Sequence, residues 1–272
     1  TVHQVSSWQS LKAAAKEAAA GDMIRLTGNI TDAGSDTDVV DGASGATLVL
    51  NKNNLTLDGN GYTITAAEGK TFCFDVDGGG AAKNTITVEN LTVDGASFSV
   101  KMGGAFFVED GARASFRRVT VRNSKAGSAS ATNGGGAIFV NDHGNPPVVT
   151  VSDCVFENNL VGDGATGRGG AIYVNNFRSQ SPVQVTVSGS TFKGNRAAYG
   201  GAIAADGVVA LTVKNCTFQG NESAVGADDL YLFDGISQGK KNMTITSQVT
   251  AVLSGNTYTN PSDSDSDLKG MN

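Results

Sequence analysis

A short repeat constrains the fold of this chain more than any other feature of its sequence. Two glycines, an alanine and a bulky apolar residue occur together at 103–106, 135–138, 169–172 and 200–203. The last three copies begin Gly135, Gly136, Ala137; Gly169, Gly170, Ala171; and Gly200, Gly201, Ala202. Each of these is followed by Phe-x-x-Asn, at Phe156 and Asn159, Phe192 and Asn195, and Phe218 and Asn221. The copies begin 31 to 34 residues apart. A unit of this length cannot bury an apolar face alone, so the repeat predicts units that stack on one another.

Within each unit, apolar residues alternate with polar ones, as at Leu211 and Val213. Alternation of this kind, with many Val, Ile and Thr residues, is typical of half-buried strands. Equivalent strands of stacked units run parallel, about 4.8 Å apart, and the crossover rule makes their winding right-handed. The sequence therefore predicts an all-β protein, a right-handed parallel β-helix or β-solenoid.

In such a β-helix, equivalent side chains form columns through the molecule. We expect the three repeat phenylalanines to stack in the core, and the three alanines to lie where only a small side chain fits. The three asparagines are expected at a corner, where their amides bond to backbone groups that turns leave unpaired. The paired glycines predict a corner with positive φ or a close backbone approach. Cys154 and Cys216 lie two units apart, which is too far for a disulfide.

Three parts of the chain are distinguished by their sequence. Residues 1–30 are predicted to form an N-terminal cap, with an amphipathic helix over about 7–20 followed by a first strand. Residues 31–260 hold the β-helix coils. Residues 261–272 begin with a proline followed by alternating Ser and Asp, and they predict an acidic tail or linker. The cap covers an end of the stack that would otherwise act as a template for aggregation.

Charge and composition exclude several classes of protein. The net charge is -6 and no run of Lys and Arg occurs, so nucleic acid is not an expected partner. No stretch of about 18 apolar residues is present, so no direct membrane span is expected. The 36 glycines occur with only 4 prolines and without a three-residue period, which argues against collagen and against disorder.

The paired GGA[I/F] and F-x-x-N motifs resemble the repeats of the polymorphic outer-membrane proteins, an autotransporter class first associated with chlamydiae. The resemblance is strong over about residues 103–226, and the N-terminal third resembles pectate-lyase-like β-helices. It implies a secreted or surface-displayed bacterial adhesin, an autotransporter passenger whose loops bind a host-cell protein or glycan. Its place would be extracellular or at the cell surface, displayed from an outer membrane. Oligomeric state does not follow from the resemblance.

The sequence departs from that family's pattern at two positions. Gly226-Ala227-Asp228 has one glycine fewer than the repeat and lacks its apolar residue, and Val121 stands where later units have Phe. The family places no catalytic residues at its repeat motifs. A ligand-free structural stalk at the cell surface is therefore a further reading of the same pattern.

Enzymes also use this fold, so an extracellular polysaccharide lyase or glycoside hydrolase is the alternative function. Such enzymes need acidic calcium ligands with a basic residue, or paired carboxylates. The best cluster of this kind is Asp142, His143, Asp163 and Arg168. The spacing of these residues matches no pectinase signature, so a solvated turn at the end of a strand is the favoured reading of Asp142 and His143. No catalytic residue is therefore assigned, and no cofactor is expected.

A structural calcium ion is the one metal that the sequence suggests. Asp36, Asp38 and Asp41 could supply oxygen ligands, but Val40 breaks the spacing of an EF-hand loop. An acidic surface loop is the favoured interpretation of this segment.

Ligand binding is expected on loops along one flank of the β-helix, because repeat proteins place function on insertions. Phe177 and Arg178, and Tyr231 with Phe233, are the candidates for stacking against a sugar or a peptide. Aromatic residues make up only 7% of the chain, which argues against a deep saccharide cleft. Phe139 and Tyr173 are expected to alternate with core residues on their strands.

Overall fold

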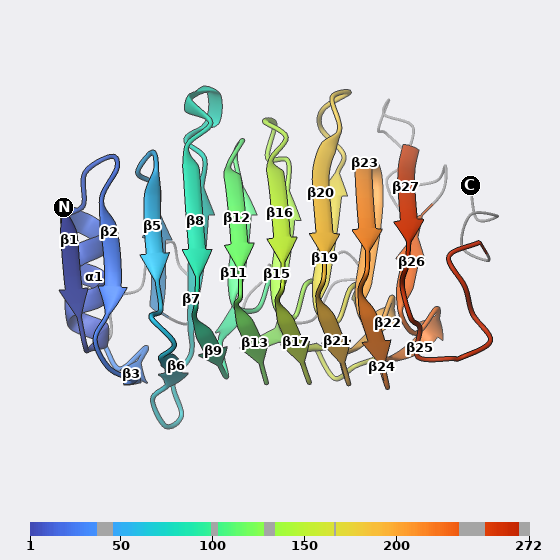
Figure 1. Cartoon of the computed structure of the whole chain (residues 1–272), viewed down its shortest axis with the longest axis horizontal. Helices are drawn as coiled ribbons and strands as arrows, with labels where there is room; N and C mark the ends of the chain where they lie inside the picture. The colour runs from blue at the N-terminus through green and yellow to red at the C-terminus, as the bar shows by residue number, and fades with distance from the viewer. Residues whose placement is uncertain (37–45, 99–102, 128–133, 166, 234–247, 267–272) are drawn as a thin grey trace.

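The computed structural model describes residues 1–36, 46–98, 103–127, 134–165, 167–233 and 248–266. These residues form a rod of stacked coils, with the strands of successive coils side by side along its length (Figure 1). Each complete coil adds one strand to each of three long faces and a short strand to a corner. Every pairing between named strands in the described ranges is parallel, which confirms the predicted parallel β-helix.

The longest row of strands, face A, holds the residues that follow each glycine-rich motif by about ten positions. Its strands are β1 (Val2–Val5), β2 (Met23–Leu26), β5 (Leu55–Asp58), β8 (Thr85–Glu89), β12 (Arg113–Arg117), β16 (Val148–Ser152), β20 (Val183–Ser188), the second part of β23 (Ile203–Lys214) and β27 (Gln248–Ser254).

Face C begins directly after each glycine pair. It contains β4 (Ala46–Leu50), β7 (Phe72–Asp77), β11 (Phe106–Glu109), β15 (Ile138–Asn141), β19 (Ile172–Asn176), the first part of β23 and β26 (Leu230–Leu232). β23 runs without a break from face C into face A, which joins the two faces into one sheet. A short 3-10 helix, η1 (Gly80–Ala82), connects β7 to β8.

Face B carries the F-x-x-N motif, and the corner after it forms a short fourth row, face D. Face B contains β3 (Ile30–Ala33), β6 (Thr63–Ala66), β9 (Thr92–Asp94), β13 (Thr120–Arg122), β17 (Val155–Glu157), β21 (Thr191–Lys193) and β24 (Thr217–Gln219). Face D contains β10 (Ser97–Phe98), β14 (Lys125–Ala126), β18 (Leu160–Val161), β22 (Arg196–Tyr199) and β25 (Glu222–Gly226).

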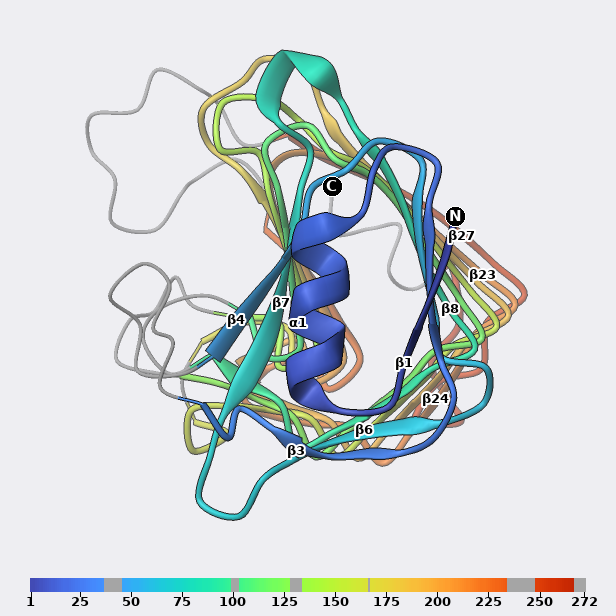
Figure 2. The same cartoon turned by 90° about the vertical axis from the view of Figure 1, so that its left-hand side faces the viewer.

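The winding of the rod is right-handed. In the view from its N-terminal end, the chain passes from face A to face B, then to face C, and returns over the top to face A (Figure 2). This path is clockwise as the chain recedes from the viewer. The prediction from the crossover rule is therefore correct.

The predicted phenylalanine column lies in the core of the rod. Phe156, Phe192 and Phe218 occupy equivalent registers of face B, and successive ring centroids are 4.9 Å apart. All three are buried, and Tyr258 extends the stack with its centroid 5.5 Å from that of Phe218. In the coil before Phe156, the register partner is Val121, as the sequence indicated.

The two glycines of each repeat motif meet two different requirements. The first has positive φ: 68° at Gly135, 63° at Gly169 and 63° at Gly200. The second allows neighbouring coils to approach closely, since a Cβ on Gly170 would lie 2.1 Å from the carbonyl oxygen of Gly201. The alanine that follows points into the fully buried core. Both of the expected uses of glycine therefore occur, one at each position.

The three repeat asparagines form a hydrogen-bonded ladder along a buried corner, as predicted. Asn159 N donates to Asn195 Oδ1, and Asn195 N donates to Asn221 Oδ1, both at 3.0 Å. Each Nδ2 also donates to a carbonyl oxygen of the preceding coil, as Asn195 does to Phe156 O at 3.0 Å. Ser124 N begins the ladder with a bond to Asn159, and Thr259 accepts the last backbone donor, from Asn221.

The helix at the N-terminus, α1 (Trp8–Glu17), is shorter than predicted and covers the open end of the core (Figure 2). Ser7 is its N-cap, and the capping box is closed by Ser10. Trp8 and Leu11 are buried, and the Trp8 ring contacts Phe72 with a centroid distance of 5.5 Å. The apolar face of α1 thus seals the first coil.

The register of the last glycine-rich copy corrects one reading of the sequence. Ala202 N donates to Asp229 O, and Ile203 pairs with Leu230. The fifth copy is therefore Ala227-Asp228-Asp229-Leu230, which has lost both glycines but has kept the apolar residue. Ala227 takes the positive φ of the first glycine, at 53°.

Two further predictions concern cysteines and the acidic tail. Cys73, Cys154 and Cys216 are free and buried, so the absence of a Cys154–Cys216 disulfide is confirmed. In the tail, Tyr258 Oη donates to Asp265 Oδ1 at 2.7 Å, and Asn256 Nδ2 donates to the same oxygen at 2.8 Å. The tail is therefore attached to the last coil as far as Asp265.

Candidate binding surface

A second apolar cluster lies on the outer surface of face C. Strand residues alternate, so Phe106 and Val108 point into the core while Phe107 points outward. Phe107, Phe139 and Tyr173 form an outward column in register, with ring centroids 5.5 and 5.1 Å apart. Phe139 and Tyr173 are buried, but outside the main core. The expectation that they alternate with core residues is confirmed, and their own burial was not foreseen.

Arg168 is the charged group of this outer cluster. Its side chain is 4% exposed, and its guanidinium forms an ion pair with Asp206, whose carboxylate is fully buried. Arg168 Nη1 donates to the hydroxyl of Tyr173 at 3.3 Å, and its Cζ lies 4.0 Å from the centroid of the Phe233 ring. The positive charge is therefore neutralised inside the flank and is not presented to a substrate.

Asp142 and His143 follow β15, where the sequence analysis placed them, but they point to different partners. Asp142 is buried, and its Oδ2 accepts a hydrogen bond from Arg178 N at 3.1 Å. Burial raises the pKa of the Asp142 carboxyl. His143 is half exposed, and its Nδ1 lies 2.5 Å from Glu109 Oε2 in the preceding coil.

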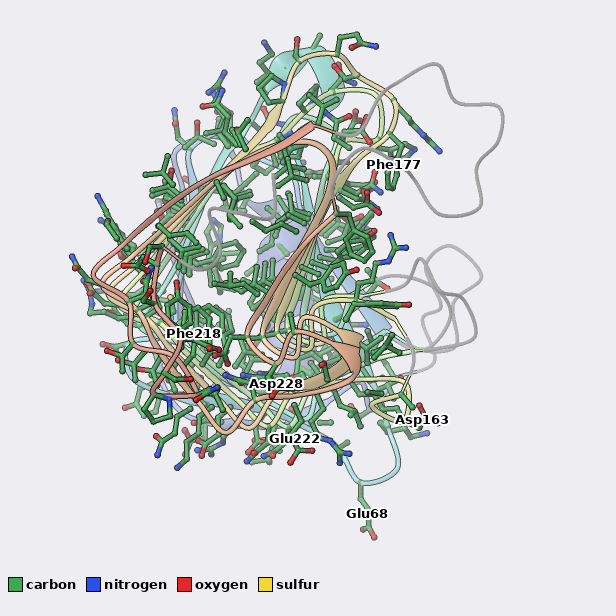
Figure 3. All side chains as sticks on the ribbon, turned by 90° about the vertical axis from the view of Figure 1, so that its right-hand side faces the viewer. Glu68, Asp163, Phe177, Phe218, Glu222 and Asp228 are labelled. Atoms are coloured by element: carbon green, nitrogen blue, oxygen red, sulfur yellow. The ribbon has the colours of Figure 1, made fainter. Side chains whose placement is uncertain are left out.

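Asp163 lies on another loop and stabilises its own turn, accepting a hydrogen bond from Ala165 N at 2.9 Å. In the view from the C-terminal end, Asp163 and Phe177 lie on separate loops of the same flank (Figure 3). Among the described residues, no hydrogen bond or ion pair joins any two of Asp142, His143, Asp163 and Arg168. Each of the four side chains instead has a hydrogen-bond or ion-pair partner outside this set.

The four loop candidates for ligand stacking divide into two pairs. Phe177 and Phe233 are buried, at 8% and 5% exposure, so their rings support the flank from within. Arg178 is exposed, and Tyr231 is half-buried beside Tyr199, with ring centroids 5.0 Å apart. Arg178 and Tyr231 are the members of this set that solvent reaches.

The calcium candidates receive no support from the described residues. Asp36 accepts a hydrogen bond from Trp8 Nε1 at 3.0 Å and forms an ion pair with Lys12, so its carboxylate ties the loop to α1. Asp38 and Asp41 lie outside the described residues. Within the described ranges, His, Cys, Asp and Glu side chains form no group of three or more that could hold a metal ion.

Sequence reasoning missed the partners that neutralise the predicted site residues. Asp206 is the main example: it occupies the register of Asn141 and Asn175 in the two preceding coils. The signal was an Asn-to-Asp change in the repeat, together with an arginine directly before the glycine pair at 169–170. Glu109, the partner of His143, lies one coil earlier at the end of β11 and could have been found from the same register.

Comparisons with known families agree with this arrangement. Residues 2–133 match the family model of a pectate lyase-like adhesive domain. Residues 153–175 and 189–206 match the Chlamydia polymorphic membrane protein repeat. No curated protein matches the chain.

These matches confirm the resemblance inferred from the repeat motifs, and they fall where it was expected. The polymorphic membrane protein repeats lie within residues 103–226, and the pectate lyase-like match covers the N-terminal part. Together they indicate a surface-exposed or outer-membrane-associated protein of the adhesive class. The helices in the described ranges are too short or too polar to cross a lipid bilayer.

Proposed function

We propose that this chain is the displayed part of a bacterial surface adhesin, and that it binds a host-cell protein or glycan through the flank of face C. The observation that carries the proposal is the buried cluster on that flank. Arg168 bonds to both Asp206 and Tyr173 beneath the surface, the half-buried Tyr231 packs against Phe233 of this cluster, and Arg178 is exposed on the loop after β19 of the same face. A rigid support of this kind holds contact residues in place and lowers the entropic cost of binding.

The adhesive description of the matched family supports the same function. The described surface offers little to the alternative, a polysaccharide lyase or hydrolase, since each candidate catalytic side chain is engaged by a local partner. Adhesion requires no reactive group, only a stable surface with accessible polar and aromatic side chains.

The test is a binding assay with the purified chain immobilised on beads. The probes are fixed epithelial cells and an array of neutral and acidic glycans. We expect saturable binding that the soluble chain inhibits, and a loss of about fivefold or more in Arg178→Ala and Tyr231→Ala. Lys214→Ala, an exposed change on face A, is the matched control and should bind normally.

Two results would contradict the proposal. One is binding no stronger than that of beads coated with an unrelated β-helix. The other is release of unsaturated products or new reducing ends from acidic polysaccharides, abolished by Asp142→Ala or His143→Ala, which would establish the enzymatic alternative.

A further inference from the structure

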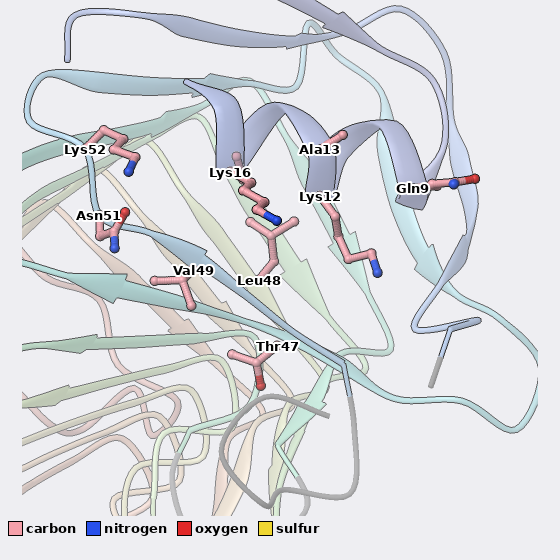
Figure 4. Close-up of a pocket in the computed structure, with 10 residues that line it drawn as sticks. Gln9, Lys12, Ala13, Lys16, Thr47, Leu48, Val49, Asn51 and Lys52 are labelled. Carbon is pink, nitrogen blue, oxygen red and sulfur yellow. The ribbon is translucent and has the colours of Figure 1, made fainter. Parts of the chain in front are cut away.

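A groove lies between α1 and β4, far from the loop candidates (Figure 4). Its volume is about 520 Å³. One wall is the outward side of α1, and the other is β4 with the residues that follow it. Although β4 is the first strand of face C, the groove lies at the N-terminal end of the rod. Ligand binding in this groove therefore does not depend on adhesion through the flank of face C.

The groove is positively charged in a chain whose net charge is -6. Lys12 and Lys16 point from α1 towards β4, and Lys52 follows the end of that strand (Figure 4). Lys12 also pairs with Asp36, whereas Lys16 and Lys52 form no ion pair with any described residue. No Asp or Glu is present among the described lining residues. The local charge therefore favours an anionic ligand.

The second property of the groove is an open strand edge. β4 pairs with β7 on one side, and no described strand pairs with its other side. In a parallel sheet, half of the backbone N–H and C=O groups of an edge strand face away from the sheet. A row of such groups is a template for adding another strand.

Together the two properties define one kind of ligand. On a strand added to β4, every second side chain would point towards α1, where Lys12 and Lys16 lie. The described residues that line the groove include no aromatic side chain for stacking on a sugar ring, and its buried lining residues, Ala15 and Leu48, are aliphatic. We infer that this groove binds an extended acidic peptide segment of a partner protein, which adds to β4 as a further strand with carboxylates at alternate positions.

The test uses a fluorescein-labelled heptapeptide of alternating Glu and Val and follows its anisotropy as the purified chain is added. We expect saturable binding. An alternating Lys and Val peptide should bind at least tenfold more weakly. Two further peptides carry N-methyl groups on one or the other set of alternate residues, and one of them should also lose at least tenfold, because methylation removes the donors that pair with the edge.

Protein variants test the same site from the other side. The double change Lys16→Glu and Lys52→Glu should weaken binding about tenfold or more, and Ala13→Trp should obstruct the groove without changing its charge. Lys70→Glu and Lys214→Glu alter exposed lysines elsewhere and should leave binding unchanged. Circular dichroism of each variant establishes that it is folded.

Three outcomes would overturn the inference. Equal binding of both N-methylated peptides and the parent would mean that no strand is added. Binding that the groove variants do not change would place the peptide elsewhere. Polygalacturonate binding that depends on Lys16 and Lys52, in the absence of peptide binding, would assign the groove to acidic glycans. Cell and glycan adhesion through face C is measured separately with Arg178→Ala and Tyr231→Ala, so failure of one proposal leaves the other standing.

Discussion

Asn195 is fully buried at a corner of the rod, and its side chain takes part in four hydrogen bonds. Its Oδ1 accepts from Asn159 N and Nδ2, and its Nδ2 donates to Phe156 O and Asn221 Oδ1, all at 3.0 Å. An amide is needed here because the site requires both a donor and an acceptor. Removing it would leave buried groups in two neighbouring coils without partners.

We therefore expect Asn195→Ala to lower the free energy of unfolding by about 2 to 4 kcal/mol, since unsatisfied buried polar groups cost about 1 to 3 kcal/mol each. Urea denaturation followed by circular dichroism measures the change. Gln219→Ala, an exposed change in the next coil, is the control and should alter stability by less than about 0.5 kcal/mol. A loss for Asn195→Ala no larger than that of the control would refute a stabilising role for the ladder.

Ala227 is a residue in an unfavourable conformation, because it has φ of 53° in the place of a repeat glycine. An L-residue in the left-handed region costs roughly 1 to 2 kcal/mol, and glycine removes this cost while losing some entropy in the unfolded chain. We expect Ala227→Gly to raise the free energy of unfolding by about 0.5 kcal/mol. Ala224→Gly, in the exposed part of β25, should lower it. The same denaturation experiment would contradict this account if both changes were destabilising.

The Asp142 carboxyl makes a pH-dependent contribution to the free energy of unfolding. Burial raises the pKa of this carboxyl in the folded state above its ordinary value of 3.8. Protonation of Asp142 therefore stabilises the fold at pH values below 3.8, and this contribution is lost as the pH rises through the folded-state pKa. The side chain introduced by Asp142→Asn does not ionise. The free energy of unfolding of this variant, relative to that of the native chain, should therefore increase between pH 4 and pH 7.

Thermal unfolding at pH 4, 5.5 and 7 measures this difference. Gln219→Ala, an exposed change at a residue that does not ionise, serves as the control, and its difference from the native chain should stay constant over the same range. A constant difference for Asp142→Asn as well would mean that burial of its carboxylate has no energetic effect.

At the scale of single elements, α1 is the part of the fold whose ends depend on local chemistry. Ser7 accepts from Ser10 N at 3.1 Å, and Ser10 Oγ accepts from Ser7 N at 3.0 Å, so each residue satisfies a donor that the first turn leaves free. This helix covers the first coil through Trp8 and Leu11. Weakening its start should therefore expose the end of the core.

We expect Ser7→Ala to lower the free energy of unfolding by about 1 kcal/mol, the usual contribution of an N-cap side chain. Ser6→Ala, one residue earlier and exposed, should change it little. Guanidinium titration of both variants makes the comparison. Equal effects at the two positions would show that the capping box does not limit the stability of this end.

Neighbouring strands of the rod are also linked by charged pairs at equal registers. Arg117 Nη2 lies 2.6 Å from Glu89 Oε2, and Arg122 Nε lies 2.9 Å from Asp94 Oδ2. These pairs are partly or largely exposed, so each contributes little, about 0 to 1 kcal/mol. They fix which residues face each other more than they stabilise the fold, and the buried columns supply most of the stability.

At the scale of the whole molecule, each coil contacts mainly its two neighbours. Stability in such a stack is a sum of nearest-neighbour terms, and the coils at the ends have one neighbour instead of two. We expect backbone amides of β12, β16 and β20 to exchange with deuterium most slowly, and those of β27 faster. Hydrogen exchange followed by mass spectrometry of peptic fragments measures the gradient. Uniform exchange along the rod would show that it unfolds only as a single cooperative unit.

Much of the architecture was predictable because it follows from the repeat. Residues that recur at fixed positions must stack, so the columns of Phe156 and Asn195 and the right-handed parallel coil could be derived from spacing and period alone. A first strand after the N-terminal helix was also expected, and β2 occupies that place, but β1, which precedes the helix, was not foreseen. The register of the last copy was not, because Ala227-Asp228-Asp229-Leu230 keeps the backbone geometry of the motif without its glycines.

The sequence by itself determined the fold class, the contents of the core and a resemblance to adhesive surface proteins. Only the tertiary structure decided which charges remain free. Arg168 and Asp206 are 38 residues apart, and their pairing depends on how far one side chain extends across neighbouring coils. The groove at Lys16 and Lys52 likewise exists because α1 packs beside the edge of β4. Repeat patterns specify which residues stack, but contacts between non-equivalent positions arise only when the coil is closed.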